Sequence, residues 1–140
     1  MKDFDVSVII PVNTGSNYMP LLLQSLEDQT VLPQEIVIVD SSLDNDIASI
    51  IRNMNGRIPI VYKKIALAYP GDARNIGVEM VKREWIALLD STTVPEHDWL
   101  ERCAEIAIEK NVDFVRGLTI FEADTYFKKL LRATTICCSP

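Results

Sequence analysis

The spacing of apolar residues alternates between two periods along the chain. Several short runs are nearly continuous in apolar, mostly β-branched residues, as in VSVIIPV and EIVIVD. Such runs are typical of strands that are covered on both faces, as in a parallel sheet. They predict strands at 6–12, 35–40, 58–62 and 85–90, with two further short strands at 113–116 and 118–121.

Between these runs, apolar residues recur every three or four positions. Met19, Leu22, Leu23 and Leu26 form one such stripe, which is the pattern of a helix with one buried side. Three more helices are predicted at 47–54, from the Pro-Gly-Asp turn at 70–72 to 80, and from 95 to 107, and we expect a last helix from residue 125. Strands that alternate with helices predict an α/β fold, with a mostly parallel sheet, right-handed crossovers and helices on both faces.

Composition limits the size of the fold and the range of its partners. The 140 residues, 48% hydrophobic and 24% charged, fit one globular domain spanning 1–140. A net charge of −6 gives no general attraction for nucleic acid or for an anionic membrane surface, so we expect no nucleic-acid partner. Three cysteines and one histidine, without metal-type spacing, exclude a zinc site. Without a signal-peptide pattern or an apolar stretch of roughly 20 residues, we expect a cytoplasmic protein with no transmembrane segment.

Polar residues stand at the carboxyl ends of the predicted strands. Asn13 follows the first strand, Asp40 ends the second, and Asp90 ends the fourth, followed by Ser91 and two threonines. In a parallel sheet these ends meet at one edge, where the loops form a ligand site. Arg74 lies close to the start of a predicted helix, and a guanidinium beside helix amides suits a diphosphate.

The chain resembles the family 2 glycosyltransferases in three stretches, which occur in this order: VSVIIPV, EIVIVDSS and GDARNIGVEMVKREWIALLDSTTVP. With the ARN helix directly before the LLD strand, the stretches together are fairly specific, and the resemblance covers nearly the whole chain. It implies a Rossmann-like, nucleotide-sugar-binding half of the GT-A fold. It also implies transfer of a sugar from a nucleotide-diphosphate donor, for which we expect a UDP-sugar, to a saccharide, lipid or protein acceptor.

The resemblance also implies roles for individual residues. In this family the acid after the second strand contacts the nucleobase, and the Arg of the ARN helix lies close to the nucleotide. The Asp-x-Asp element after the fourth strand holds the ribose and, on the diphosphate, a divalent cation, Mg²⁺ or Mn²⁺. Carried over to this chain, the expected nucleotide-binding residues are Pro11, Val12, Asn13, Asp40, Arg74, Asp90 and Ser91, and Asp90 is also the expected metal ligand.

The chain departs from the family pattern in three places. Thr92 stands where the second acid of the Asp-x-Asp element is expected, and a neutral hydroxyl is a poor ligand for a hard cation, so we expect weakened metal binding. Ser41 stands where a second adjacent acid is common. The general base that takes the acceptor's proton belongs to an acceptor-binding half, which we expect beyond Pro140. No catalytic residue is therefore assigned, and we expect the isolated chain to be inactive.

Other interpretations remain open. One alternative is a non-catalytic or degenerate module that keeps the fold for binding or assembly. Another is a nucleotidyltransferase or a different nucleotide-binding enzyme, although the sequence has no phosphate-binding glycine loop. For single residues, Asp40 and Asp90 are alternatively turn caps, as are the hydroxyl residues that follow Asp90. Arg74 is alternatively a surface residue paired with Asp72 or Glu79 of its own helix.

Overall fold

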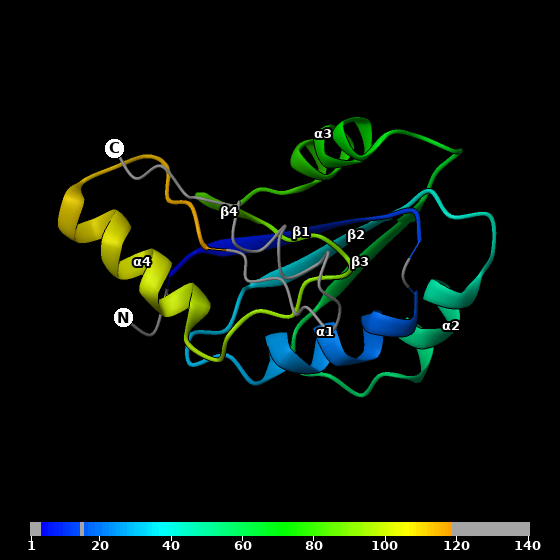
Figure 1. The fold of residues 1–140 in the computed structure, drawn as a ribbon, viewed down its shortest axis with the longest axis horizontal. Helices are drawn as coiled ribbons and strands as arrows, with labels where there is room; N and C mark the ends of the chain where they lie inside the picture. The colour runs from blue at the N-terminus through cyan, green and yellow to red at the C-terminus, as the bar shows by residue number, and fades with distance from the viewer. Residues whose placement is uncertain (1–3, 15, 119–140) are drawn as a thin grey trace, which may run out of the picture.

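Four parallel strands form the centre of the molecule, in the order β3-β2-β1-β4 (Figure 1). The computed structural model describes residues 4–14 and 16–118. The strands are β1 (Val6–Val12), β2 (Glu35–Asp40), β3 (Ile60–Lys64) and β4 (Trp85–Leu88). A 3₁₀ turn, η1 (Ser16–Tyr18), precedes α1 (Met19–Glu27), and the other helices are α2 (Asp46–Asn53), α3 (Pro70–Met80) and α4 (Trp99–Lys110). The predicted fold class, α/β with a parallel sheet, is confirmed.

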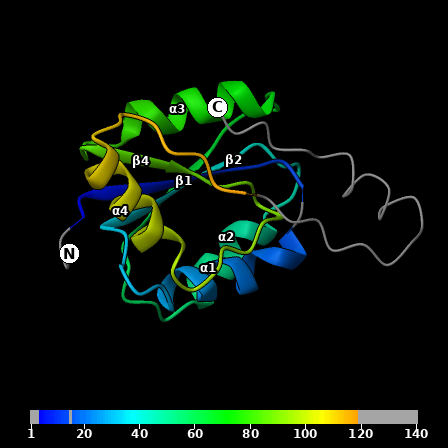
Figure 2. The same cartoon turned by 60° about the vertical axis from the view of Figure 1, so that its left-hand side comes forward.

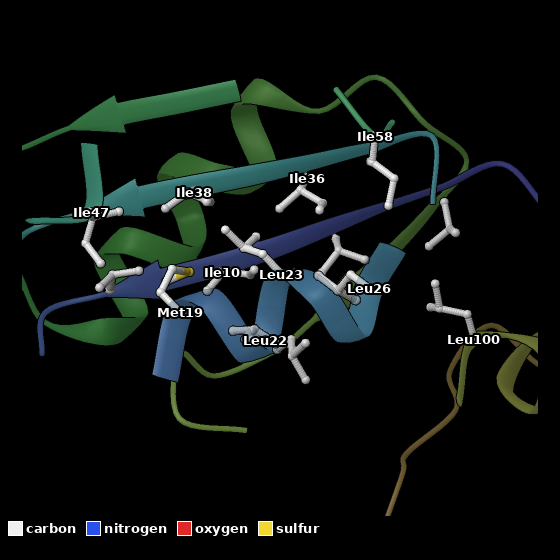
Figure 3. Packing of buried hydrophobic residues seen from close by; sticks show 14 of the residues in the cluster. Ile10, Met19, Leu22, Leu23, Leu26, Ile36, Ile38, Ile47, Ile58 and Leu100 are labelled. Carbon is white, nitrogen blue, oxygen red and sulfur yellow. The ribbon is translucent and has the colours of Figure 1, made fainter. Parts of the chain in front are cut away.

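Helices cover both faces of the sheet: α1 and α2 lie on one face and α3 lies on the other (Figures 1 and 2). Successive side chains of a strand point to opposite faces, so β1 and β2 contribute to two cores. The larger core lies between the sheet and α1 (Figure 3), and includes Ile10, Met19, Leu22, Leu23, Leu26, Ile36, Ile38 and Ile47. The smaller core lies under α3 and is formed by Ile9, Val37, Val39 and Ala73. Because β1 is buried along its whole length, it can offer polar groups to a ligand only at its end.

The bounds of β1 and β2 agree with the sequence prediction, whereas those of β3 and β4 differ from it. β3 begins two residues later than predicted, because the Ile58 amide donates to the Glu27 carboxylate at 2.9 Å instead of joining the sheet. The strand then runs on to Lys64. β4 ends at Leu88, two residues before Asp90, so Asp90 belongs to the loop at the edge of the sheet.

The first turn of the predicted fourth helix is also absent, and α4 begins at Trp99 instead of residue 95. The Glu96 carbonyl accepts a hydrogen bond from the Gln29 side chain at 2.6 Å, and the His97 carbonyl accepts one from the Thr30 amide at 3.0 Å. These bonds to the segment after α1 hold the chain in a non-helical path. Within the described part of the chain, no helix is long and apolar enough to cross a membrane.

The predicted strand at 113–116 is wrong. The chain leaves α4 through Asn111 in the left-handed conformation (φ 49°), a common way to end a helix. Phe114 is then 78% exposed, and no described strand pairs with this segment. A strand forms only where a neighbour supplies its hydrogen bonds. Most of the predicted strand at 118–121 and the whole predicted helix from residue 125 lie outside the described residues.

α3 approaches the sheet closely at a glycine. A Cβ atom added at Gly77 would lie 2.5 Å from Cγ2 of Ile9 and 3.5 Å from Cγ2 of Val39. Both neighbours belong to the smaller core, where close packing leaves little room for them to move. The glycine therefore sets the distance between α3 and the sheet, and with it the position of Arg74 one turn earlier in the helix.

We expect Gly77→Ala to destabilise the fold by about 1–3 kcal/mol, because the added methyl group must displace a core side chain. Gly71→Ala is the matched control in the same helix, because nothing lies within 4 Å of its added Cβ, and we expect it to cause no loss of stability. The free energy of unfolding from urea denaturation measures both effects. Equal stability of the two variants would show that α3 does not depend on close packing at Gly77.

Candidate functional site

The carboxyl ends of the strands bring the predicted site residues to one edge of the sheet. β1 lies between β2 and β4, so Asn13, just after β1, lies between Asp40 and Asp90. Pro11 and Val12 are buried at the end of β1, and Asn13 is exposed. β2 and β4 are two strand spacings apart, roughly 10 Å. A ligand that contacts both acids must therefore cross the end of β1.

Two buried serines hold the end of β1 from either side. Ser41 donates to the Val12 carbonyl from its amide at 2.7 Å and from its hydroxyl at 3.1 Å. Ser91 donates from its hydroxyl to the Thr14 carbonyl at 3.1 Å. The Ser91 hydroxyl, predicted to contact the nucleotide, thus positions the loop after β1. Ser41, at the position where a second acid was expected, also binds the backbone.

Asp40 ends β2 with its side chain fully buried. Its Oδ1 accepts hydrogen bonds from the Ser42 amide at 2.8 Å and the Ser42 hydroxyl at 2.6 Å. Its Oδ2 accepts bonds from the Tyr62 hydroxyl at 2.7 Å and from Nζ of Lys64 at 3.1 Å. The bonds from Ser42 are those of a turn cap, whereas those from β3 tie two strand ends together. All four lone-pair positions of the carboxylate are occupied, so a nucleobase can bond to Asp40 only if one donor leaves.

The hydrogen bonds keep Asp40 charged despite its burial. Desolvation raises the pKa of the Asp40 carboxyl, but the bonds from Ser42, Tyr62 and Lys64 together lower it more, so the pKa lies below its ordinary value. Desolvation and the adjacent Asp40 carboxylate raise the pKa of Tyr62 to about 12. The Tyr62 hydroxyl therefore remains a donor, and Asp40 remains a carboxylate, throughout the physiological pH range.

The sequence analysis missed Tyr62 and Lys64. The strand register pairs Lys64 with Asp40 and Tyr62 with Ile38, which puts both side chains on the Asp40 side of the sheet. The available signal was two polar residues at alternate positions near the end of the third predicted strand. It was inconclusive, because only the order of strands in the sheet shows that β3 is the neighbour of β2.

Arg74 and Asp90 form a direct ion pair, with Nη2 of Arg74 2.5 Å from Oδ1 of Asp90. Among the described residues, Arg74 pairs with this acid and not with an acid of its own helix. The side chains of Arg74 and Asp90 are 35% and 63% exposed. An ion pair with this much exposure to water contributes only about 0–1 kcal/mol to stability. The two residues line a depression of about 340 Å³ together with Leu88, Leu89 and Thr93. A ligand can therefore reach the pair and replace one partner at little cost.

The described residues do not by themselves complete a site for a divalent cation. Nowhere in 4–14 and 16–118 do three His, Cys, Asp or Glu side chains converge on one point. The Asp90 carboxylate is held by Arg74, and the exposed Thr92 offers a neutral hydroxyl. A Mg²⁺ or Mn²⁺ ion at Asp90 would need further anionic oxygens, such as those of a diphosphate.

Comparison with solved structures identifies the class of fold. S. aureus TarS (residues 1–349) is 24% identical, with a TM-score of 0.68, over 83% of this chain and 38% of that one. TarS structures with UDP and with UDP-GlcNAc each match with a TM-score of 0.67. A mannosyltransferase from Pyrobaculum calidifontis, in complex with GDP-Man and Mn²⁺, is 21% identical, with a TM-score of 0.65, over 73% of this chain and 32% of that one. The architecture is that of the GT-A glycosyltransferases.

The sequence comparison identifies the family within that class. The family model of glycosyl transferase family 2 matches residues 7–133, and the chain belongs to this family. One relative, an uncharacterized glycosyltransferase of Rickettsia bellii, is 31% identical over 116 residues, which are 81% of this chain and 16% of the relative. The chain spans between 12% and 46% of the length of eight curated relatives that it matches.

We expect Tyr62→Phe to destabilise the fold at neutral pH by about 1–3 kcal/mol, the value of a hydrogen bond to a charged group. Because the folded-state pKa of Asp40 is lowered, the stabilisation from its charge is present above the ordinary pKa of 3.8 and is lost as the pH falls through the folded-state value. Removing the Tyr62 donor raises that pKa, so the difference between variant and native chain should shrink in acid.

Urea denaturation of both chains at pH 7 and in acid measures this difference in unfolding free energy. Tyr69→Phe is the control, since the Tyr69 side chain is 83% exposed and forms no hydrogen bond to Asp40. If the Tyr62→Phe difference were the same at both pH values, Tyr62 would stabilise the fold by packing and not through the Asp40 charge.

Proposed function

We propose that this chain is the donor-binding part of a glycosyltransferase whose donor is a nucleotide-diphosphate sugar, and that this donor is a UDP-sugar. The observation that carries the proposal is the placement of Asp40 and the Arg74–Asp90 pair on opposite sides of the end of β1. A carboxylate on one side suits an N–H group of a nucleobase. A guanidinium beside the start of a helix on the other side suits a diphosphate.

The contacts that we propose follow the order of the strands. The base lies at Asp40 on β2, the sugar of the nucleoside crosses the end of β1 near Asn13, and the diphosphate lies at Arg74. In this arrangement Asp90 gives up its bond to Arg74 and bonds to ribose hydroxyls, and together with the diphosphate it would hold a divalent cation. Arg74 then stabilises the negative charge that grows on the diphosphate as the sugar leaves.

The neighbouring structures support a nucleotide-diphosphate-sugar donor, and TarS supports the choice of uridine. TarS has been solved with UDP and UDP-GlcNAc, and the Pyrobaculum mannosyltransferase has been solved with GDP-Man. We assign donor binding alone to this chain, because it spans less than half of the length of curated relatives such as WfgD of Escherichia coli, of which it covers 46%. In this proposal a further part of the protein supplies the general base and the contacts to a saccharide, lipid or protein acceptor.

We expect the chain to bind UDP more tightly than ADP, CDP or GDP, and to transfer no sugar by itself. Asp40→Asn should weaken UDP binding by about 1–3 kcal/mol, because an amide replaces the charged acceptor. Asp113→Asn, a change of an exposed acid after α4, is the control and should leave affinity unchanged. Isothermal titration calorimetry measures all of these affinities. The donor proposal would be refuted if the folded chain did not bind UDP.

We expect Mn²⁺ to raise the UDP affinity of the native chain only modestly, because Asp90 and the diphosphate would hold the ion without a second acid. Thr92→Asp should enlarge this effect, since it adds an anionic oxygen beside Asp90, whereas Thr92→Ser should not. Titrations of UDP with Mn²⁺ and with EDTA measure the difference. A native affinity that rises a hundredfold or more with Mn²⁺, about 3 kcal/mol, would contradict this account. So would a folded Thr92→Asp chain with an unchanged metal effect.

A further inference from the structure

Lys64 is the most accessible of the three residues that donate to Asp40. Ser42 is buried and Tyr62 is half-buried, whereas Lys64 is exposed. The Lys64 side chain keeps 35% of its surface in solvent while the Asp40 side chain keeps none. Lys64 therefore forms the outer cover of a carboxylate that has no opening to solvent of its own.

The Lys64 ammonium group has three acceptors around it, which match its three hydrogens. These acceptors are Oδ2 of Asp40 at 3.1 Å, Oγ of Ser42 at 3.1 Å and the carbonyl oxygen of Asp44. The last two belong to the loop after β2. Lys64 can therefore give up its bond to Asp40 and still be held at the site by Ser42 and Asp44.

The other donors to Asp40 cannot leave as easily. If the buried Ser42 groups or the Tyr62 hydroxyl turned away, they would lose their partner where little or no water can replace it, which costs about 1–3 kcal/mol for each group. A lysine ammonium at the surface is readily solvated. A ligand that bonds to Asp40 will therefore replace Lys64 before it replaces Ser42 or Tyr62.

We propose that Lys64 is a nucleobase-recognition residue. When UDP binds, the uracil N3–H takes the place of Lys64 at Oδ2 of Asp40. The released ammonium hydrogen then turns to one of the two uracil carbonyl oxygens that flank N3. This role rests on the proposed binding of UDP at Asp40. The exchange breaks the Lys64–Asp40 bond and the bonds of the two uracil groups to water, and it forms two direct bonds between the protein and the base. Asp40 keeps its three bonds from Ser42 and Tyr62 and remains ionised.

Two analogues of UDP test this role without any change to the protein. In 2-thio-UDP and 4-thio-UDP, one carbonyl oxygen is replaced by sulfur, a weak hydrogen-bond acceptor, while N3–H is kept. We expect one of the two analogues to bind the native chain about tenfold or more weakly than UDP, because Lys64 donates to that oxygen. If both analogues bind as tightly as UDP, Lys64 donates to neither carbonyl and its proposed role is wrong.

Variants of the two adjacent lysines of β3 extend the test. Lys64→Met should weaken UDP binding by about 10- to 100-fold and abolish the preference for oxygen over sulfur. Lys64→Arg keeps a cationic donor and should keep that preference. Lys63→Met is the matched control, because Lys63 pairs in register with Val39 and lies on the α3 side of the sheet. This variant should change neither the affinity for UDP nor the preference for oxygen over sulfur.

The preference for oxygen over sulfur separates recognition from a structural role, because a residue that only stabilises the site would weaken all three ligands equally. Native-like affinity in Lys64→Met, or an unchanged oxygen preference in that variant, would overturn the proposal. If Lys64→Met does not fold, titrations of the two analogues against the native chain and against Lys64→Arg test the proposal. Absence of UDP binding to the native chain would refute the donor proposal and the role of Lys64 together, whereas UDP binding without an oxygen preference would refute the role of Lys64 alone.

Discussion

The burial of β1 between two layers of helices is the constraint on which the rest of the structure depends. All seven of its residues are buried, facing α1 on one side and α3 on the other. Its one polar side chain, Ser7, donates to Glu35 at 2.7 Å and so avoids the cost of an unpaired buried group. A strand of this kind cannot present ligand-binding groups along its length. The groups that can bind a ligand are therefore confined to the edge of the sheet where β1 ends, and the neighbouring elements provide them.

The two acids at that edge are held in opposite ways. Asp40 is buried and bonded on both oxygens by three residues, whereas Asp90 is 63% exposed and, within the described part of the chain, is paired with Arg74. A buried, fully bonded carboxylate has a fixed position and stays charged, which suits the recognition of one particular group. An exposed pair is inexpensive to open, which suits exchange with a phosphate or a cation. The net charge of −6 makes such local cationic groups as Arg74 and Lys64 necessary for any anionic ligand.

Two of the three departures from the family pattern, Ser41 and Thr92, have different consequences for the site. Ser41 stands in place of an acid, and its hydroxyl adds a bond to the Val12 carbonyl beside the one from its backbone amide, so the serine helps to hold the end of β1. Thr92 replaces an acid beside Asp90 and stays exposed, so the change removes a negative charge from the edge of the sheet without a visible gain.

The sequence by itself determined the α/β class, the bounds of β1 and β2, the position of Asp40 at the end of β2 and that of Arg74 near the start of α3. These features follow from local periodicity, which depends on residues only a few positions apart. Tertiary structure decided the start of β3 and of α4, because distant groups, the Glu27 carboxylate and the Gln29 side chain, take up the backbone there. It also placed Lys64 on Asp40 and Arg74 on Asp90. Those pairings depend on strand order and helix packing, which local periodicity does not encode.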